Sequence, residues 1–119
     1  ACPLTEHTRN LLSRERIAKL RRGARLVNIA RGAVWDQEAI CDALESEQLE
    51  AVFTDVTVPE PLPASHRLWG TRGMIMTPHI GADDQERYND VTLDILLENL
   101  RADRAGKRLP NRVDPEKGY

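Results

Sequence analysis

Residues 26–36 constrain the fold of this chain most, because they have the pattern of a strand, a tight turn and the start of a helix. The run 26–29 is short, apolar and rich in branched residues, which predicts a buried strand that ends at Arg31. Gly32 follows, and glycine permits a tight turn at little steric cost. Asp36 stands at the N-cap position of a helix. The inward positions of that helix are Ala39, Ile40, Ala43 and Leu44. The segment is typical of one step of an α/β fold.

The same construction recurs twice farther along the chain. The apolar segment 51–56 runs into a proline-rich loop that presents Glu60, and the segment 74–77 is followed closely by His79. In an open parallel sheet, ligands bind outside the carboxyl ends of the strands, and Arg31, Glu60 and His79 each follow a strand. Each residue alone is more typical of a solvated surface position. Their joint spacing predicts that they converge on one small molecule.

The segments around these strands predict further elements of the same fold. Ser13 can cap a helix over residues 14–22. The inward side chains of that helix are Ile17, Ala18 and Leu20. Leu68 and Trp69 are expected to pack on the core, and His66 is expected to be structural or exposed.

A long helix is predicted to begin at Asp83 or Asp84 and to end near Ala105, where Gly106 stops it. Its apolar positions cover more than one face, so we expect the helix to be buried between two bodies. These positions are Tyr88, Val91, Leu93, Ile95, Leu96, Leu97 and Leu100.

Composition narrows the class of protein. The 119 residues suit about one small domain, with room for half of a dinucleotide-binding fold. Lysine and arginine number 17 against 19 acidic residues, which gives neither a basic field for nucleic acid nor a polybasic membrane patch. Cys2 and Cys41 make no CxxC motif or disulfide framework, and there is no signal peptide or long apolar span. We therefore expect a cytoplasmic protein that binds neither nucleic acid nor a membrane.

Several blocks of sequence carry a family resemblance. They are Cys2-Pro3-Leu4-Thr5 with Thr8, residues 26–32 with Asp36, Asp55 with Glu60-Pro61-Leu62-Pro63, His66 with Leu68-Trp69, and Thr77-Pro78-His79-Ile80-Gly81. In this order and at these intervals they resemble the C-terminal half of the D-isomer-specific 2-hydroxyacid dehydrogenases. Within that family the chain is most similar to the glyoxylate/hydroxypyruvate reductases and the phosphoglycerate dehydrogenase-like members. It departs from the family at Trp35, usually a small aliphatic residue, and at Arg67, usually proline.

The resemblance implies an oxidoreductase that uses NAD or NADP, without a metal, on a small 2-hydroxy or 2-keto acid. Arg31 would hold the substrate carboxylate and carbonyl oxygen, since a planar guanidinium matches a carboxylate. His79 would be the general acid and base at the 2-hydroxyl, and Glu60 would pair with it. The implied cofactor contacts are Cys2, Ile29, Ala30, Arg31, Asp55, His79, Ile80 and Gly81.

The sequence contains no GxGxxG phosphate loop and no acidic ribose-binding residue downstream of one. The resemblance therefore implies that residues 1–82 are the second half of a Rossmann-type, parallel-sheet NAD(P)-binding domain. Residues 83–119 would be a crossover helix and tail that belong to a substrate domain, most of which would lie outside this chain together with the first half of the cofactor domain. We expect the full-length protein to be a homodimer, or a partner chain to carry the N-terminal half.

A protein of another class is the main alternative. Corepressors of the C-terminal-binding type share the fold and the triad residues, so a non-catalytic, NAD-sensing interaction protein also fits the sequence. Formate dehydrogenases of the superfamily carry glutamine at the position that matches Glu60, so this residue argues against formate as the substrate.

Overall fold

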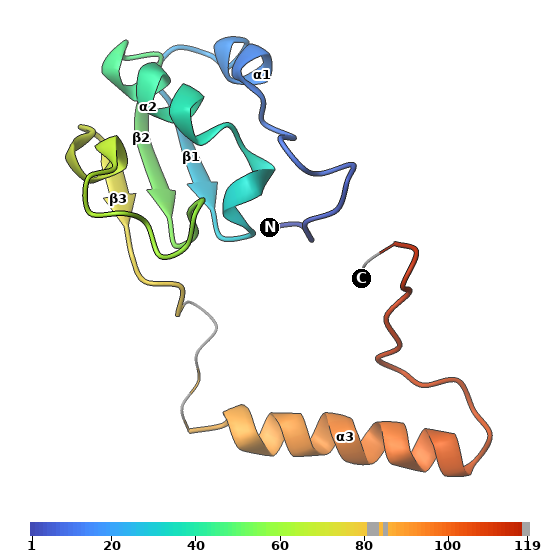
Figure 1. The fold of residues 1–119 in the computed structure, drawn as a ribbon. Coiled ribbons are helices and arrows are strands. Elements are labelled where there is room, and N and C mark those ends of the chain that lie inside the picture. The colour runs from blue at the N-terminus through green and yellow to red at the C-terminus, as the bar shows by residue number, and fades with distance from the viewer. Residues whose placement is uncertain (81–83, 85, 118–119) are drawn as a thin grey trace. The chain divides into compact units, whose positions relative to one another are not determined.

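The computed structural model describes residues 1–80, 84 and 86–117, which fall into two compact units, Ala1–Gly81 and Ala82–Tyr119. The first, here called the sheet unit, holds a three-stranded sheet with short helices, and the second, the helix unit, holds a long helix and an irregular tail (Figure 1). The elements are α1 (Arg14–Ala18), β1 (Ala24–Asn28), the 3-10 helix η1 (Gly32–Val34), α2 (Gln37–Glu45), β2 (Leu49–Thr54), the 3-10 helix η2 (Arg67–Gly70), β3 (Met74–Met76) and α3 (Tyr88–Arg104).

The sheet is parallel throughout, with its strands in the order β1-β2-β3. The three arrowheads point the same way in Figure 1, so the loops that follow the strands all leave from one edge of the sheet. The α/β, parallel-sheet prediction is therefore confirmed. Residues aligned across the three strands are Leu26 with Val52 and Met74, Val27 with Phe53 and Ile75, and Asn28 with Thr54 and Met76.

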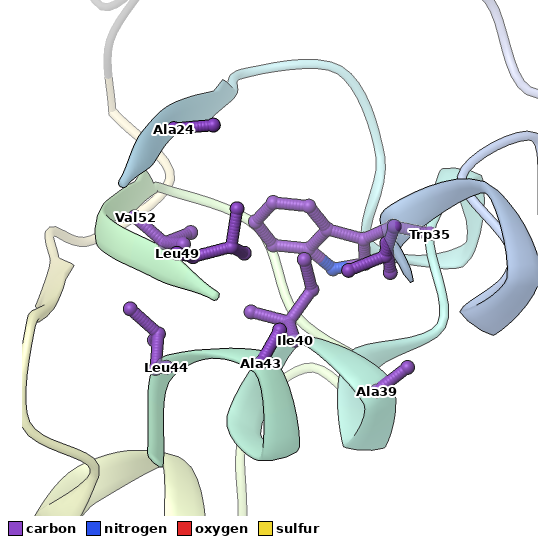
Figure 2. Packing of buried hydrophobic residues seen from close by; sticks show 9 residues of the cluster. Ala24, Trp35, Ala39, Ile40, Ala43, Leu44, Leu49 and Val52 are labelled. Atoms are coloured by element: carbon purple, nitrogen blue, oxygen red, sulfur yellow. The ribbon is translucent and has the colours of Figure 1, made fainter. Parts of the chain in front are cut away.

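One face of the sheet forms the core with α1 and α2 (Figure 2). The cluster consists of Ile17, Ala24, Trp35, Ala39, Ile40, Ala43, Leu44, Leu49 and Val52. All four inward positions predicted for α2 are buried in it. Trp35, for which the sequence suggested no role, is 5% exposed, and its indole extends toward Leu49 (Figure 2). The large ring fills core volume between the sheet and α2.

The opposite face of the sheet is exposed, which contradicts the prediction that β1 is wholly buried. Val27 is 68% exposed, Ile29 53% and Ile75 55%. Side chains alternate between the faces of a strand, and α1 and α2 pack on the other face. Parallel sheets are usually covered on both faces, so their strands carry apolar side chains on both faces. This explains why β1 has apolar residues on its exposed face.

The strand–turn boundaries differ from the prediction because of two polar side chains. β1 ends at Asn28 rather than Arg31, since Asn28 Oδ1 accepts from the backbone N–H of Ala30 and its Nδ2 donates to the carbonyl of Arg31. These bonds replace ladder bonds with a side-chain-supported turn. β2 ends at Thr54 rather than Val56, where the Thr54 hydroxyl bonds the backbone N–H and carbonyl of Val56.

The two helices of the sheet unit differ in how well they were predicted. Asp36 caps α2 as expected, because its carboxylate accepts from the backbone N–H of Ala39 at 2.9 Å. The first helix was predicted too long: α1 ends at Ala18 instead of continuing to Arg22, and Ala18 is exposed. Ser13 occupies the N-cap position of α1 without a side-chain hydrogen bond, so this helix lacks the cap that was expected to support it.

Arg67, just before β3, is tied to α2 by ion pairs. Its guanidinium lies 2.7 Å from Glu45, 2.8 Å from Asp42 and 3.2 Å from Glu38. Hydrogen bonds from Arg14 and Arg67 hold the pKa of Asp42 below its usual value. Arg67 therefore adds a polar cross-link between η2 and α2.

In the helix unit, α3 begins at Tyr88 rather than at Asp83 or Asp84. Asp84 instead accepts from the backbone N–H of Arg87, while Asp83 lies outside the described residues. The helix stops at Gly106 as predicted, with a φ of 63°. The seven apolar side chains predicted to be buried, from Tyr88 to Leu100, are between 43% and 62% exposed. Among the described residues, no helix has the length and apolar character that crossing a bilayer demands.

From the exposed apolar face of the sheet we predict the dye binding and self-association of the 119-residue chain by itself. We expect it to bind a hydrophobic dye and to self-associate, because exposed patches of this kind drive association. The double substitution Val27→Thr with Ile75→Thr should reduce dye fluorescence and shift the chain to smaller species in size-exclusion chromatography. Threonine suits a strand but removes apolar surface.

The control substitution is Val52→Thr, which places a hydroxyl in the core and costs about 1–3 kcal/mol. This variant should increase dye binding. A parent chain that is monomeric and binds no dye would show that the face is covered.

Candidate active site

The loops after β2 and β3 bring Glu60 and His79 together at the carboxyl edge of the sheet. His79 Nδ1 and Glu60 Oε1 lie 2.9 Å apart, and the two side chains are 41% and 42% exposed. An ionised carboxylate only accepts hydrogen bonds, so Nδ1 carries the proton that is shared. The other ring nitrogen, Nε2, is then the one placed to exchange a proton with a bound molecule.

A cavity of about 450 Å³ lies beside this pair. Its volume is in the range of small-molecule sites. Its walls come from the ends of β2 and β3, the proline-rich loop and η2: Thr54, Asp55, Thr57, Glu60, Pro61, Leu62, Trp69, Met76, Thr77, Pro78 and His79. The hydrogen-bonded Glu60–His79 pair therefore stands in the wall of a largely apolar cavity.

Asp55, also in the cavity wall, carries an unsatisfied polar atom. Its Oδ1 is buried and has no hydrogen-bond partner among the described residues. A buried acceptor without a partner is costly, and a donor such as an amide N–H₂ group would relieve that cost.

Arg31 follows β1, but its guanidinium does not join the pair. Its Nη1 donates to the carbonyl of Ala30 at 2.7 Å, and no described hydrogen bond connects Arg31 to Glu60 or His79. The backbone of its loop is nevertheless close to the loop that carries Glu60. A Cβ atom at Gly32 would clash with the carbonyl oxygen of Thr57. The turn after β1 thus packs directly on the loop that carries Glu60.

The other predicted cofactor contacts that the structure describes lie outside the cavity wall. Cys2 is half-buried in the N-terminal loop, Ile29 is exposed and Ala30 is buried in the turn after β1. Ile80 is 60% exposed, and Gly81 lies outside the described residues. Of the cofactor contacts that the resemblance implied, Asp55 and His79 are the ones that line the cavity.

Trp69 was predicted to pack on the core and does not. It is 58% exposed, lines the cavity, and its Nε1 donates to the carbonyl of Pro63 at 3.0 Å. The prediction for its neighbour was correct, because Leu68 is 1% exposed. Within a 3-10 helix adjacent side chains point in different directions, so one apolar residue reaches the core and the next reaches the site.

Comparison with known proteins decides the family. Residues 1–81 match the model of the D-isomer specific 2-hydroxyacid dehydrogenase, NAD binding domain. The chain belongs to this family. The match covers the sheet unit, and therefore includes Asp55, Glu60 and His79.

Individual dehydrogenases are similar over nearly the whole chain. Glyoxylate/hydroxypyruvate reductase B of Erwinia tasmaniensis is 41% identical over 113 residues, 95% of this chain but 35% of that protein. Glyoxylate reductase/hydroxypyruvate reductase of Mus musculus is 37% identical over 95% of this chain and 34% of its own length. This chain thus spans about a third of these relatives.

A solved structure gives the same result. The D-isomer specific 2-hydroxyacid dehydrogenase of Xanthobacter autotrophicus Py2, in complex with NADPH and MES, matches with a TM-score of 0.89 and 39% identity. The match covers 99% of this chain and 48% of that one. In the part of the chain that the structure describes, no three potential ligand side chains gather into a metal site.

In this dehydrogenase fold, the contact at Gly32 should be intolerant of a side chain. We expect Gly32→Ala to lower the free energy of unfolding by about 1–3 kcal/mol, because the added methyl meets backbone atoms of Thr57 that cannot rotate away. Chemical denaturation of the purified protein measures the change.

The matched control is Gly70→Ala, since a Cβ at Gly70 meets nothing within 4 Å. It should change stability by about 0.5 kcal/mol or less. Equal effects of the two substitutions would contradict the close packing of the two loops.

Proposed function

We propose that this chain supplies the catalytic side of an NAD(P)-dependent 2-hydroxyacid dehydrogenase that interconverts a small 2-keto acid and its 2-hydroxy acid. The carrying observation is the Glu60–His79 pair in the wall of a cavity that is also lined by Asp55, whose Oδ1 has no hydrogen-bond partner among the described residues. The names of the similar proteins include glyoxylate/hydroxypyruvate reductase, formate dehydrogenase and D-mandelate dehydrogenase, and we propose glyoxylate, hydroxypyruvate or a related acid as the substrate.

Each residue has a distinct role in this proposal. Nicotinamide, when bound, supplies the hydride chemistry at the carbon that bears the substrate oxygen. His79 Nε2 gives a proton to that oxygen in reduction and takes it back in oxidation. Glu60 orients the imidazole through Nδ1 and faces the charge that the protonated ring carries. Asp55 Oδ1 would accept from the carboxamide of the cofactor.

Arg31 would bind the substrate carboxylate. To do so, its side chain leaves the carbonyl of Ala30 and turns toward the cavity, which its exposed position allows. A guanidinium offers two parallel donors to a carboxylate, so one residue both binds and orients the acid. Cys2, Ile29, Ala30, Ile80 and Gly81 would complete the contacts to NAD or NADP.

The domain assignment extends the family match. We propose that residues 1–82 form the second half of the NAD(P)-binding domain and that residues 83–119 cross to the substrate domain. The exposed sheet face and the exposed apolar side chains of α3 are the surfaces that the rest of the fold would cover. That remainder would come from the same polypeptide or from a partner chain, and the whole would be a cytoplasmic homodimer. We call this assembly the complete dehydrogenase.

A non-catalytic, NAD-sensing role of the corepressor type is the competing function. Both functions use the fold, but only catalysis requires turnover. The two functions are separated by adding glyoxylate or hydroxypyruvate to the complete dehydrogenase with NADH or NADPH. The absorbance of the reduced nicotinamide then reports whether the cofactor is oxidised. Binding of the cofactor without turnover of these or other small 2-keto acids would overturn the proposal.

Arg31→Lys tests the residue proposed to bind the substrate carboxylate. In the complete dehydrogenase we expect this charge-conserving change to reduce kcat/KM for the keto acid on the order of 100-fold, because lysine cannot form the bidentate pair. The KM for the cofactor should change little. Steady-state kinetics with each substrate varied in turn measures both values.

Arg25→Lys is the control, since Arg25 lies at the start of β1, away from the cavity, and pairs with Glu50. It should have parental kinetics. Parental kinetics in Arg31→Lys as well would remove Arg31 from the substrate site.

A further inference from the structure

We propose that Gln37 is the positioning residue for the Glu60–His79 pair, an inference that rests on the function proposed above. Gln37 is the first residue of α2 and is 8% exposed. A buried glutamine at the start of a helix must satisfy its amide, and here the partner is not in the helix. It lies in the loop that carries Glu60.

The amide of Gln37 grips the backbone of Val58 with two hydrogen bonds. Gln37 Nε2 donates to the Val58 carbonyl at 2.8 Å, and Gln37 Oε1 accepts from the Val58 N–H at 2.9 Å. A peptide N–H can only donate and a carbonyl can only accept, so the orientation of the glutamine amide is fixed. Val58 is thus held at both polar groups although its side chain is 47% exposed.

This clamp acts close to Glu60. One residue, Pro59, separates Val58 from Glu60, and Pro61 follows, so the rings restrict the backbone on both sides of the acid. On the other side of Val58, the carbonyl of Thr57 packs against Gly32. With Thr57 and Val58 immobilised, few backbone rotations remain by which Glu60 could move away from His79.

The same clamp relates Glu60 to Arg31. Arg31 precedes η1, and η1 leads directly into α2, so Gln37 belongs to the segment that carries the arginine. Its bonds to Val58 therefore join the loop after β1 to the loop after β2.

His66 also contacts Gln37. Its Nε2 lies 3.1 Å from the amide nitrogen of Gln37 and 3.3 Å from the carboxylate of Glu38.

Gln37→Met in the complete dehydrogenase tests the role, because methionine has similar length but no hydrogen-bonding amide. We expect kcat for keto-acid reduction to fall on the order of 10-fold, since small misplacements of a catalytic group are costly. The KM for NADH or NADPH should stay within about twofold, because Gln37 does not line the cavity. The hydrogen-bonded Nδ1 proton of His79, followed by NMR, should weaken or disappear.

Gln48→Met is the matched control. Gln48 is half-buried and also donates to a backbone carbonyl, that of Leu20, but it precedes β2 at the opposite end of the strand. It should keep the parental kcat and the His79 signal. If both variants lose kcat alike, or if Gln37→Met keeps it, Gln37 is not a positioning residue.

Two further outcomes keep the inference separate from the proposed function and from folding. If the parent reduces no keto acid, the proposed function fails, while the His79 signal in Gln37→Met still decides whether Gln37 holds the pair. If Gln37→Met does not fold, Gln37→Glu keeps the acceptor for the Val58 N–H and removes the donor to its carbonyl. A reduced kcat in Gln37→Glu supports the inference, and a parental kcat overturns it.

Discussion

Parallel pairing of β1, β2 and β3 is the constraint on which the rest of the structure depends. It sends the loops after all three strands to the same edge of the sheet, where their polar residues can meet. The packing of Gly32 on Thr57 and the clamp of Gln37 on Val58 then fix the first two loops to one another. The Glu60–His79 contact joins the second loop to the third. The strand topology brings the three loops to the same region, and these three contacts between loops fix the positions of the polar residues.

How much of this could be predicted from the sequence depends on the range of the interaction. The strand–turn–helix step, the cap at Asp36 and the stop at Gly106 are local, and the structure confirms them. The end of β1 was placed too late because the side chain of Asn28 replaces the ladder bonds that the apolar pattern suggested. The grip of Gln37 on Val58 joins residues far apart in sequence and leaves no periodic pattern to detect. Trp69 was wrongly predicted to pack on the core, because an apolar side chain in the sequence can line a cavity as well as fill the core.

The exposed face of the sheet shows a different kind of error. The apolar run in β1 was interpreted as a buried strand, and it has the composition of one, but Val27 and Ile29 face away from α1 and α2. An apolar run on this face fits the proposal that other parts of a complete dehydrogenase would cover it. The chain spans about a third of the length of the similar reductases. The same proposal extends to the exposed apolar residues of α3.

In the proposed mechanism, Glu60 affects catalysis only through His79. A double-mutant cycle in the complete dehydrogenase tests it most directly, with kcat/KM for keto-acid reduction measured for Glu60→Gln, His79→Asn and the double variant. If Glu60 works by orienting the imidazole, Glu60→Gln should reduce kcat/KM in the parent but cause no further loss once His79 is replaced. The same fold-loss in both backgrounds would show that the two residues act independently and would contradict the account.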